Sequence, residues 1–189
     1  GLSEALKGDK AKAQQFYERA GLLDKSFEEV GLNNRGTLLL QARDGAKAIG
    51  EYTKALELSR ASGNRTAEAI TLQNLGAAYH SLRDERKAIG MFDQALELHR
   101  SSGDLRAQAI VLNNLMVSWN ILDRPRLATL YGKQAVNILQ GLRGGIRTFD
   151  TDIQKSFLST VDYAYRTLAE LLIKQHRYHE AERVIRMLK

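Results

Sequence analysis

The fold is decided by residues 72–96, which read LQNLGAAYHSLRDERKAIGMFDQAL. Two apolar patterns of helical spacing lie in this stretch, one over residues 72–82 and one over residues 88–96. Between them, Asp84 stands four residues before Ala88, where a carboxylate can accept hydrogen bonds from the free N–H groups of a new helix. The stretch therefore predicts a hairpin of two helices.

The same pattern recurs at an offset of 40 residues. Leu72-Gln73-Asn74-Leu75 is followed at that offset by Leu112-Asn113-Asn114-Leu115 and preceded by Leu32-Asn33-Asn34. The units end at Ser62-Gly63-Asn64 and Ser102-Gly103-Asp104, where glycine can adopt the left-handed conformation that ends a helix. A fixed period of this length predicts a solenoid, in which each hairpin stacks on its neighbours.

We predict an all-α fold, a right-handed superhelical solenoid of antiparallel helix hairpins with repeats of about 40 residues. The chain is expected to form a single solenoid with a partial first repeat, three full repeats, a Gly-rich loop and an elongated C-terminal hairpin. These parts are expected at residues 1–24, 25–62, 64–102, 104–141, 142–151 and 152–189. In the last hairpin, the apolar pattern predicts one helix of 24 residues, from Asp152 to Gln175.

Aspartates are expected to cap the second helix of each hairpin. Asp9, Asp44 and Asp84 each precede the opening alanine by four residues, and Asp123 takes the same role one residue early, with Pro125 just inside the helix.

Two glycines are expected inside these second helices. Gly50 and Gly90 cost about 1 kcal/mol each relative to alanine. We therefore expect them to mark a close approach between helices.

Seven residues of the central unit resemble the tetratricopeptide repeat signature: Leu72, Leu75, Gly76, Tyr79, Ala88, Phe92 and Ala95. Two features depart from the common pattern. Gly63 and Gly103 stand where the family usually has proline, and the unit is longer than the usual 34 residues. The longer unit resembles the variants found in kinesin light chains and bacterial signalling proteins. The resemblance implies a non-catalytic scaffold for protein–protein interaction.

Residues 47–189 also resemble the tetratricopeptide region that leads into the CHAT domain, a caspase-like peptidase domain of bacterial proteins. Leu142-Arg143-Gly144 and Gln154-Lys155-Ser156-Phe157-Leu158 carry this resemblance, because neither belongs to the general repeat. It implies that the chain is the regulatory or sensor region of a larger CHAT-type protease. The histidine and cysteine of the CHAT domain itself are not in this sequence.

Asn34, Asn74 and Asn114 fall at one repeat position, two residues after the leucine that opens the pattern. This spacing turns them roughly 200° around the helix from that leucine, which points them away from the core and into the concave groove of a solenoid. A row of amides can bond the backbone of an extended peptide, since each amide both donates and accepts. In peptide-binding tetratricopeptide proteins an asparagine at this place often does so, and the resemblance implies the same here. Alternatively, each asparagine bonds a neighbouring helix and recurs through repeat duplication.

The same register predicts further residues of the groove, namely Gln73, His80, Asn113, Asn120 and Arg166. The carboxylate clamp of some tetratricopeptide proteins also needs lysines and arginines around the asparagines. Only Arg35 and Arg166 are placed for this role, so we expect no strong selectivity for an acidic C-terminus. Arg35 stands where later units have leucine, so the first full hairpin is either less well packed or sends this side chain into the groove.

No enzyme signature is found. The sequence has no cysteine, which excludes a thiolate nucleophile, a disulfide and a cysteine-ligated zinc. His176 and His179 have no third ligand in reach, so we expect no metal and no cofactor. No run of about 18 apolar residues and no signal peptide is present, and the expected location is cytoplasmic.

The net charge of +6 is local. Residues 1–123 hold 16 basic and 16 acidic residues, whereas residues 124–189 hold 12 and 6. A protein or peptide partner with an acidic surface is therefore expected at the C-terminal third, ahead of a nucleic acid. Two alternatives stay open: nucleic-acid binding through this basic third, and self-association through exposed solenoid ends.

Overall fold

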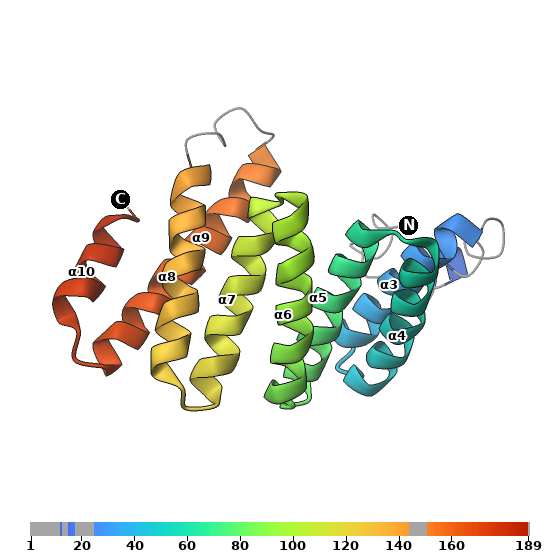
Figure 1. Cartoon of the computed structure of the whole chain (residues 1–189), viewed down its shortest axis with the longest axis horizontal. Helices are drawn as coiled ribbons and strands as arrows, with labels where there is room; N and C mark the ends of the chain where they lie inside the picture. Colours follow the sequence, from blue (N-terminus) through green and yellow to red (C-terminus); the bar gives the residue numbers. More distant parts are fainter. Residues whose placement is uncertain (1–11, 13–14, 18–24, 144–150, 189) are drawn as a thin grey trace. The chain divides into compact units, whose positions relative to one another are not determined.

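The computed structural model describes residues 12, 15–17, 25–143 and 151–188, and every regular element in these ranges is an α-helix (Figure 1). Most of the predicted partial first repeat, including Asp9, and residues 144–150 of the predicted Gly-rich loop lie outside the described residues. The labelled helices are α3 (Lys25–Gln41), α4 (Gly45–Ser62), α5 (Arg65–Ser81), α6 (Glu85–Ser102), α7 (Leu105–Ile121), α8 (Pro125–Leu142), α9 (Thr151–Lys174) and α10 (Tyr178–Arg186). The expected 24-residue helix is observed as α9.

The chain divides into two compact units, Gly1–Leu98 and His99–Lys189, with the division inside α6. In the first unit, α4 packs between α3 and α5, and α3 also lies beside α5. In the second unit, α7 packs on α8, α8 on α9 and α9 on α10, while α7 contacts α9. Each unit is therefore built from hairpins in which first helices neighbour first helices. We call α3, α5, α7 and α9 the first helices and α4, α6, α8 and α10 the second helices.

The turn inside each hairpin places a residue other than glycine in the left-handed region. These residues are Arg43, Arg83, Asp123 and His176, with φ between 54° and 63°. The next residue is the N-cap: Asp44 accepts from the backbone N–H of Lys47 at 3.2 Å, and Asp84 does the same for Lys87. The expectation that Asp123 caps α8 is wrong, because Asp123 takes the left-handed position and Arg124 becomes an N-cap without a side-chain hydrogen bond.

The turns between hairpins follow the prediction. Gly63 and Gly103 have φ of 70° and 72°, the left-handed conformation expected of a C-cap glycine. The following residues, Asn64 and Asp104, accept hydrogen bonds from the backbones of Ala67 and Ala107 at 3.1 and 2.9 Å. Every connection in these three repeats is thus short, which keeps consecutive helices antiparallel.

In each of the three full repeats, a glycine on one helix meets a large side chain on the other. A Cβ added to Gly36 would lie 2.6 Å from the ring of Tyr52, and one added to Gly76 would overlap Phe92 in the same way. In the third repeat the large side chain is on the first helix, because a Cβ on Gly132 of α8 would lie 2.5 Å from Sδ of Met116 on α7.

The two glycines expected at close helix approaches do not lie at any. A Cβ added to Gly50 or Gly90 would have no described heavy atom within 4 Å beyond its own helix backbone and chain neighbours. The expectation is therefore wrong, and neither glycine is required by packing.

Candidate functional site

The predicted asparagines lie on the first helices, and in the first unit a residue beside them organises the site. Asn33 of α3 donates from Nδ2 to Oγ1 of Thr71 on α5 at 2.8 Å. Its Oδ1 accepts a hydrogen bond of 3.3 Å from Nδ2 of Asn74. Asn33 therefore ties the two first helices together, and for Asn74 this bond is the alternative in which the asparagine contacts a neighbouring helix.

Asn34 and Asn74 are both half-buried, but their polar groups differ. The side-chain amide of Asn34 makes no hydrogen bond to any residue that the structure describes. Asn74 uses its nitrogen for Asn33 and keeps its carbonyl oxygen unbonded within the same ranges. One complete amide and one amide oxygen are thus available on neighbouring helices of the first unit.

An apolar side chain precedes each predicted asparagine by one helical turn. Val30 is 50% exposed and Ile70 is 47% exposed, four residues before Asn34 and Asn74 respectively. Residues four apart lie on the same face of a helix, so each amide has an exposed β-branched neighbour. Sequence reasoning missed these residues, although their own offset of 40 was the signal that could have found them. We define the first-helix face of the first unit as Val30, Asn34, Ile70 and Asn74.

Gln73 and His80 complete the predicted set in this unit. Gln73 is half-buried and forms no side-chain hydrogen bond within the described ranges. His80 lies near the end of α5, where its Nδ1 is 3.0 Å from Oε2 of the buried Glu85 at the start of α6. His80 is therefore held at a hairpin turn, away from the asparagines.

Arg35 neither disrupts the hairpin nor remains an unpaired cation. Its guanidinium donates to Glu51 of α4 through Nε at 2.9 Å and through Nη2 at 2.8 Å. The ion pair spans the two helices of the first full hairpin. Its charge is matched within the protein, so it is not free for a ligand carboxylate.

The second unit carries the next predicted residues on α7. Asn114 is half-buried without a side-chain hydrogen bond among the described residues, and Ile110 precedes it by one turn. Asn113 is only 7% exposed, and its Oδ1 has no partner within those ranges. Asn120 is exposed near the helix end. Only Asn114 therefore repeats the arrangement of Asn34.

Arg166 is exposed on α9 and bonded within its own helix. Its Nε lies 2.8 and 2.7 Å from the two carboxylate oxygens of Asp162, one turn earlier. These contacts raise the pKa of Arg166, with the hydrogen bond to Asp162 as the main cause. The second cation expected near the asparagines is thus also paired.

The described residues contain no group of three or more His, Asp or Glu side chains that could hold a metal ion. His176 and His179 are exposed, and Nδ1 of His176 is 2.9 Å from the Tyr178 hydroxyl. Within the same residues, no helix is both long and apolar enough to cross a membrane.

Residues 28–101 match the tetratricopeptide repeat model. The matched stretch contains the first-helix face of the first unit. Proteins with these repeats are generally non-catalytic scaffolds for protein or peptide partners. No significant match was found among curated proteins.

Solved structures share the fold. BtubC (BKLC) from P. vanneervenii is 23% identical over 97% of this chain and 75% of its own, with a TM-score of 0.81. A putative kinesin light chain with nearly identical TPR-like repeats from Podosopora anserina is 10% identical, covering 99% and 89%, with a TM-score of 0.71. MamA is 16% identical, covering 98% and 90%, with a TM-score of 0.69. The predicted all-α class of stacked helix hairpins is confirmed.

Proposed function

We propose that this chain is a non-catalytic scaffold that binds an extended peptide or a partner helix along its first helices. The observation that carries the proposal is the first-helix face of the first unit. There, the Asn34 amide and the carbonyl oxygen of Asn74, both unbonded among the described residues, lie one turn from the exposed side chains of Val30 and Ile70. The tetratricopeptide repeats over residues 28–101 support the same function class.

The chemistry of this face suits a peptide backbone. The Asn34 amide can donate to a carbonyl oxygen and accept from an N–H group, whereas Asn74 offers an acceptor. Val30 and Ile70 add apolar surface that an aliphatic or aromatic side chain of the ligand would cover. Such a site fixes the path of the backbone while leaving most side-chain positions of the ligand unspecified.

Asn114 on α7 belongs to the proposal through its repeat position. Ile110 precedes it by one turn, as Val30 and Ile70 precede the earlier asparagines. We propose that Gln73 borders the same face. The two arginines expected near the asparagines are paired with Glu51 and Asp162, which argues against a clamp for an acidic C-terminus.

A more specific proposal concerns the protein context. The resemblance of residues 47–189 to the region before a CHAT domain suggests a sensor that regulates an attached protease. Partner binding would change the conformation of the solenoid and, through it, the attached catalytic domain. The parent gene tests this directly. An open reading frame that continues past Lys189 into a domain with a His/Cys pair would support the link, and its absence would remove the link while leaving the scaffold.

The scaffold function is tested by selecting peptides from a displayed random library on the immobilised Arg183→Gln variant, so that the exposed basic side chain on α10 does not select peptides of its own. We expect selected peptides to bind the Asn34→Ala/Asn74→Ala double variant at least tenfold more weakly, because each lost hydrogen bond contributes about 1 kcal/mol. Gln140→Ala, which removes an exposed amide from a second helix, is the matched control. Val30→Ser/Ile70→Ser tests the apolar part without removing a side-chain hydrogen bond.

Two results would contradict this function. One is a set of peptides whose affinity is unchanged in both double variants, provided that the variants melt at the temperature of the parent protein. The other is an absence of peptide binding together with binding of labelled single-stranded RNA that falls steeply with salt, which would favour the nucleic-acid alternative.

A further inference from the structure

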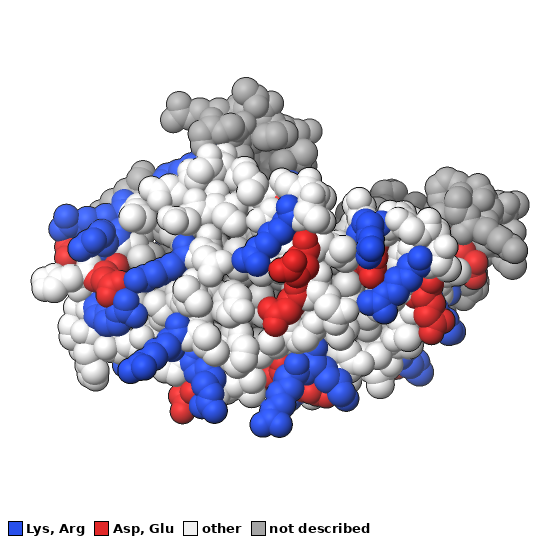
Figure 2. All heavy atoms as spheres, viewed as in Figure 1, with Lys and Arg blue, Asp and Glu red and all other residues white. Residues whose placement is uncertain are grey.

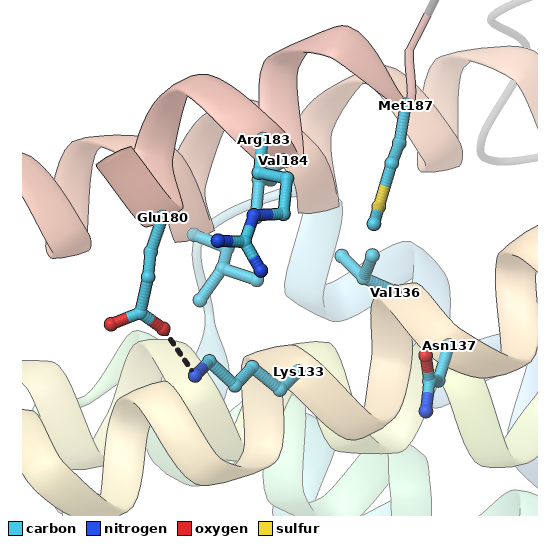
Figure 3. Close-up of a pocket in the computed structure, with 8 residues that line it drawn as sticks. Lys133, Val136, Asn137, Glu180, Arg183, Val184 and Met187 are labelled. Atoms are coloured by element: carbon cyan, nitrogen blue, oxygen red, sulfur yellow. Dashed lines mark hydrogen bonds and ion pairs between the residues drawn. The ribbon is translucent and has the colours of Figure 1, made fainter. Parts of the chain in front are cut away.

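A cavity of about 240 Å³ opens between α8 and α10, on the second-helix side of the second unit (Figure 3). Its apolar lining comes from Val136 of α8, Leu168 of α9 and Val184 of α10. Polar and longer side chains surround it: Lys133, Asn137, Glu180, Arg183 and Met187. A space with an apolar floor and a polar rim suits an apolar group attached to a polar one.

The single carboxylate at this cavity is already matched. Glu180 lies 2.6 Å from Nζ of Lys133 and accepts two hydrogen bonds from Arg177, at 2.7 and 2.8 Å. These donors, Arg177 first and Lys133 second, lower the pKa of Glu180 to about 2. Glu180 therefore stays ionised and shared between two cations near neutral pH.

Arg183 is the unmatched charge. It is exposed, it lines the cavity, and its guanidinium has no hydrogen bond or ion pair with any residue that the structure describes. Asn137, across the cavity on α8, is also unbonded within those ranges. The rim thus offers one free guanidinium and one free amide, both suited to a carboxylate.

The basic and apolar surface continues along α8 beyond the cavity. Arg126, Leu130, Lys133 and Asn137 follow a spacing of four, three and four residues, which places them on one stripe of the helix. Leu130 is 52% exposed. Figure 2 shows basic side chains gathered over α8 and α10 on this face. The stripe spans roughly 17 Å at 1.5 Å per residue, about the length of five extended residues.

We propose that the groove between α8 and α10 binds a short acidic peptide segment, with one apolar side chain in the cavity and a carboxylate on Arg183. A second acidic residue of the segment pairs with Arg126 at the far end of the stripe, and Leu130 covers an apolar position between them. A lone small acid would use only Arg183, whereas a segment of about five residues uses the whole stripe. This site is separate from the asparagines of the first unit and does not depend on them.

The test selects displayed random heptapeptides on the full chain carrying Asn34→Ala/Asn74→Ala, which weakens binding at the competing first-helix face. We expect enrichment of Asp or Glu beside a large apolar residue. The affinity of the selected peptides should fall at least tenfold in Arg183→Gln and less than twofold in Arg186→Gln, a matched loss of charge on the same helix outside the cavity. Asn137→Trp, which fills the cavity from an exposed position, should also weaken binding.

Four outcomes would overturn the proposal. The first is that no enriched peptide depends on Arg183. In the second, Arg183→Gln and Arg186→Gln weaken binding equally, because only net charge then matters. In the third, fluorescein-labelled single-stranded RNA binds with the same dependence on Arg183. In the fourth, sedimentation shows a dimer that Arg183→Gln dissociates, which assigns the groove to a second copy. Thermal melts confirm that each variant remains folded.

Discussion

At the scale of single residues, small and large side chains exchange places between hairpins. Gly36 and Gly76 of the first helices receive the rings of Tyr52 and Phe92, whereas in the third repeat Met116 of the first helix fills the space over Gly132. Each pair joins a glycine on one helix to a large side chain on the other, and only in the third repeat does the first helix supply the large side chain. Packing constrains the sum of two side chains, so the repeat pattern tolerates the reversal.

The reversed pair, Gly132 and Met116, predicts that mutations at the two positions have coupled effects on the free energy of unfolding. Gly132→Ala should lower the free energy of unfolding by about 1–3 kcal/mol, because the new methyl group overlaps Met116. In a Met116→Ala background the same change should cost much less, since the sulfur is gone. Urea denaturation of the two single variants and the double variant measures the coupling. Additive effects would show that the two residues do not share this space.

The buried side chain of His99 predicts that the stability of the folded protein depends on pH. It is 4% exposed and its Nε2 has no partner among the described residues. Burial lowers its pKa from 6.5, and the opposing attraction of Asp104 is smaller. Because the folded state binds the proton less tightly than the unfolded state, this contribution to stability is complete above pH 6.5 and declines as the pH falls from there toward the folded pKa.

His99→Leu removes this titration and introduces the residue found 40 positions later, the buried Leu139. Urea denaturation between pH 7.5 and 5 should show a shallower loss of stability for the variant than for the parent protein. Equal slopes for the two proteins would mean that His99 titrates normally in the folded state.

At the scale of elements, α8 begins without the cap that its counterparts have. Arg124 stands where Asp44 and Asp84 accept hydrogen bonds from their helices. Arg124→Asp should therefore raise the free energy of unfolding by about 1 kcal/mol, through a new cap and a favourable interaction with the helix dipole. Arg124→Ala separates removal of the arginine from creation of the cap. If aspartate and alanine gave equal stability in urea denaturation, the capping explanation would fail.

Glycines inside helices have opposite roles in the first hairpin. Gly50→Ala on α4 should stabilise the protein by about 1 kcal/mol, because its Cβ enters open space and alanine favours the helix. Gly36→Ala on α3 should destabilise it, since the Cβ meets the ring of Tyr52. Thermal melts of the two variants should move in opposite directions. A shift of the same sign in both would contradict this assignment.

At the scale of the whole chain, the helices of the repeats could be predicted from the sequence, because each repeat contains residues that mark its own helix ends. The Asp44 and Asp84 caps and the glycine at 63 are local signals, and each fixes a helix end through its own backbone chemistry. The offset of 40 shows that the pattern recurs along the chain. The expectation of a close helix approach at Gly50 was wrong, because the sequence alone does not show whether a neighbouring side chain lies against a glycine in a helix.

The candidate site was predicted less completely. Periodicity placed Asn34 and Asn74 on first helices, but it could not show that Asn33 would take the nitrogen of Asn74, since that bond joins residues 41 apart. The cavity between α8 and α10 was also beyond periodicity, because it depends on the side chains of three helices together. The excess of positive charge in residues 124–189 did predict an acidic partner for the part of the chain that contains α8 and α10.

The most direct test of the proposed scaffold is a proton–nitrogen NMR titration with a peptide selected on the Arg183→Gln variant, which lacks the anchor of the groove between α8 and α10. We predict that the side-chain amide signals of Asn34 and Asn74 shift on saturation, while that of Gln140 stays in place. Shifts confined to residues of the second helices, with both asparagine signals unchanged, would contradict the central claim that the first helices bind the partner.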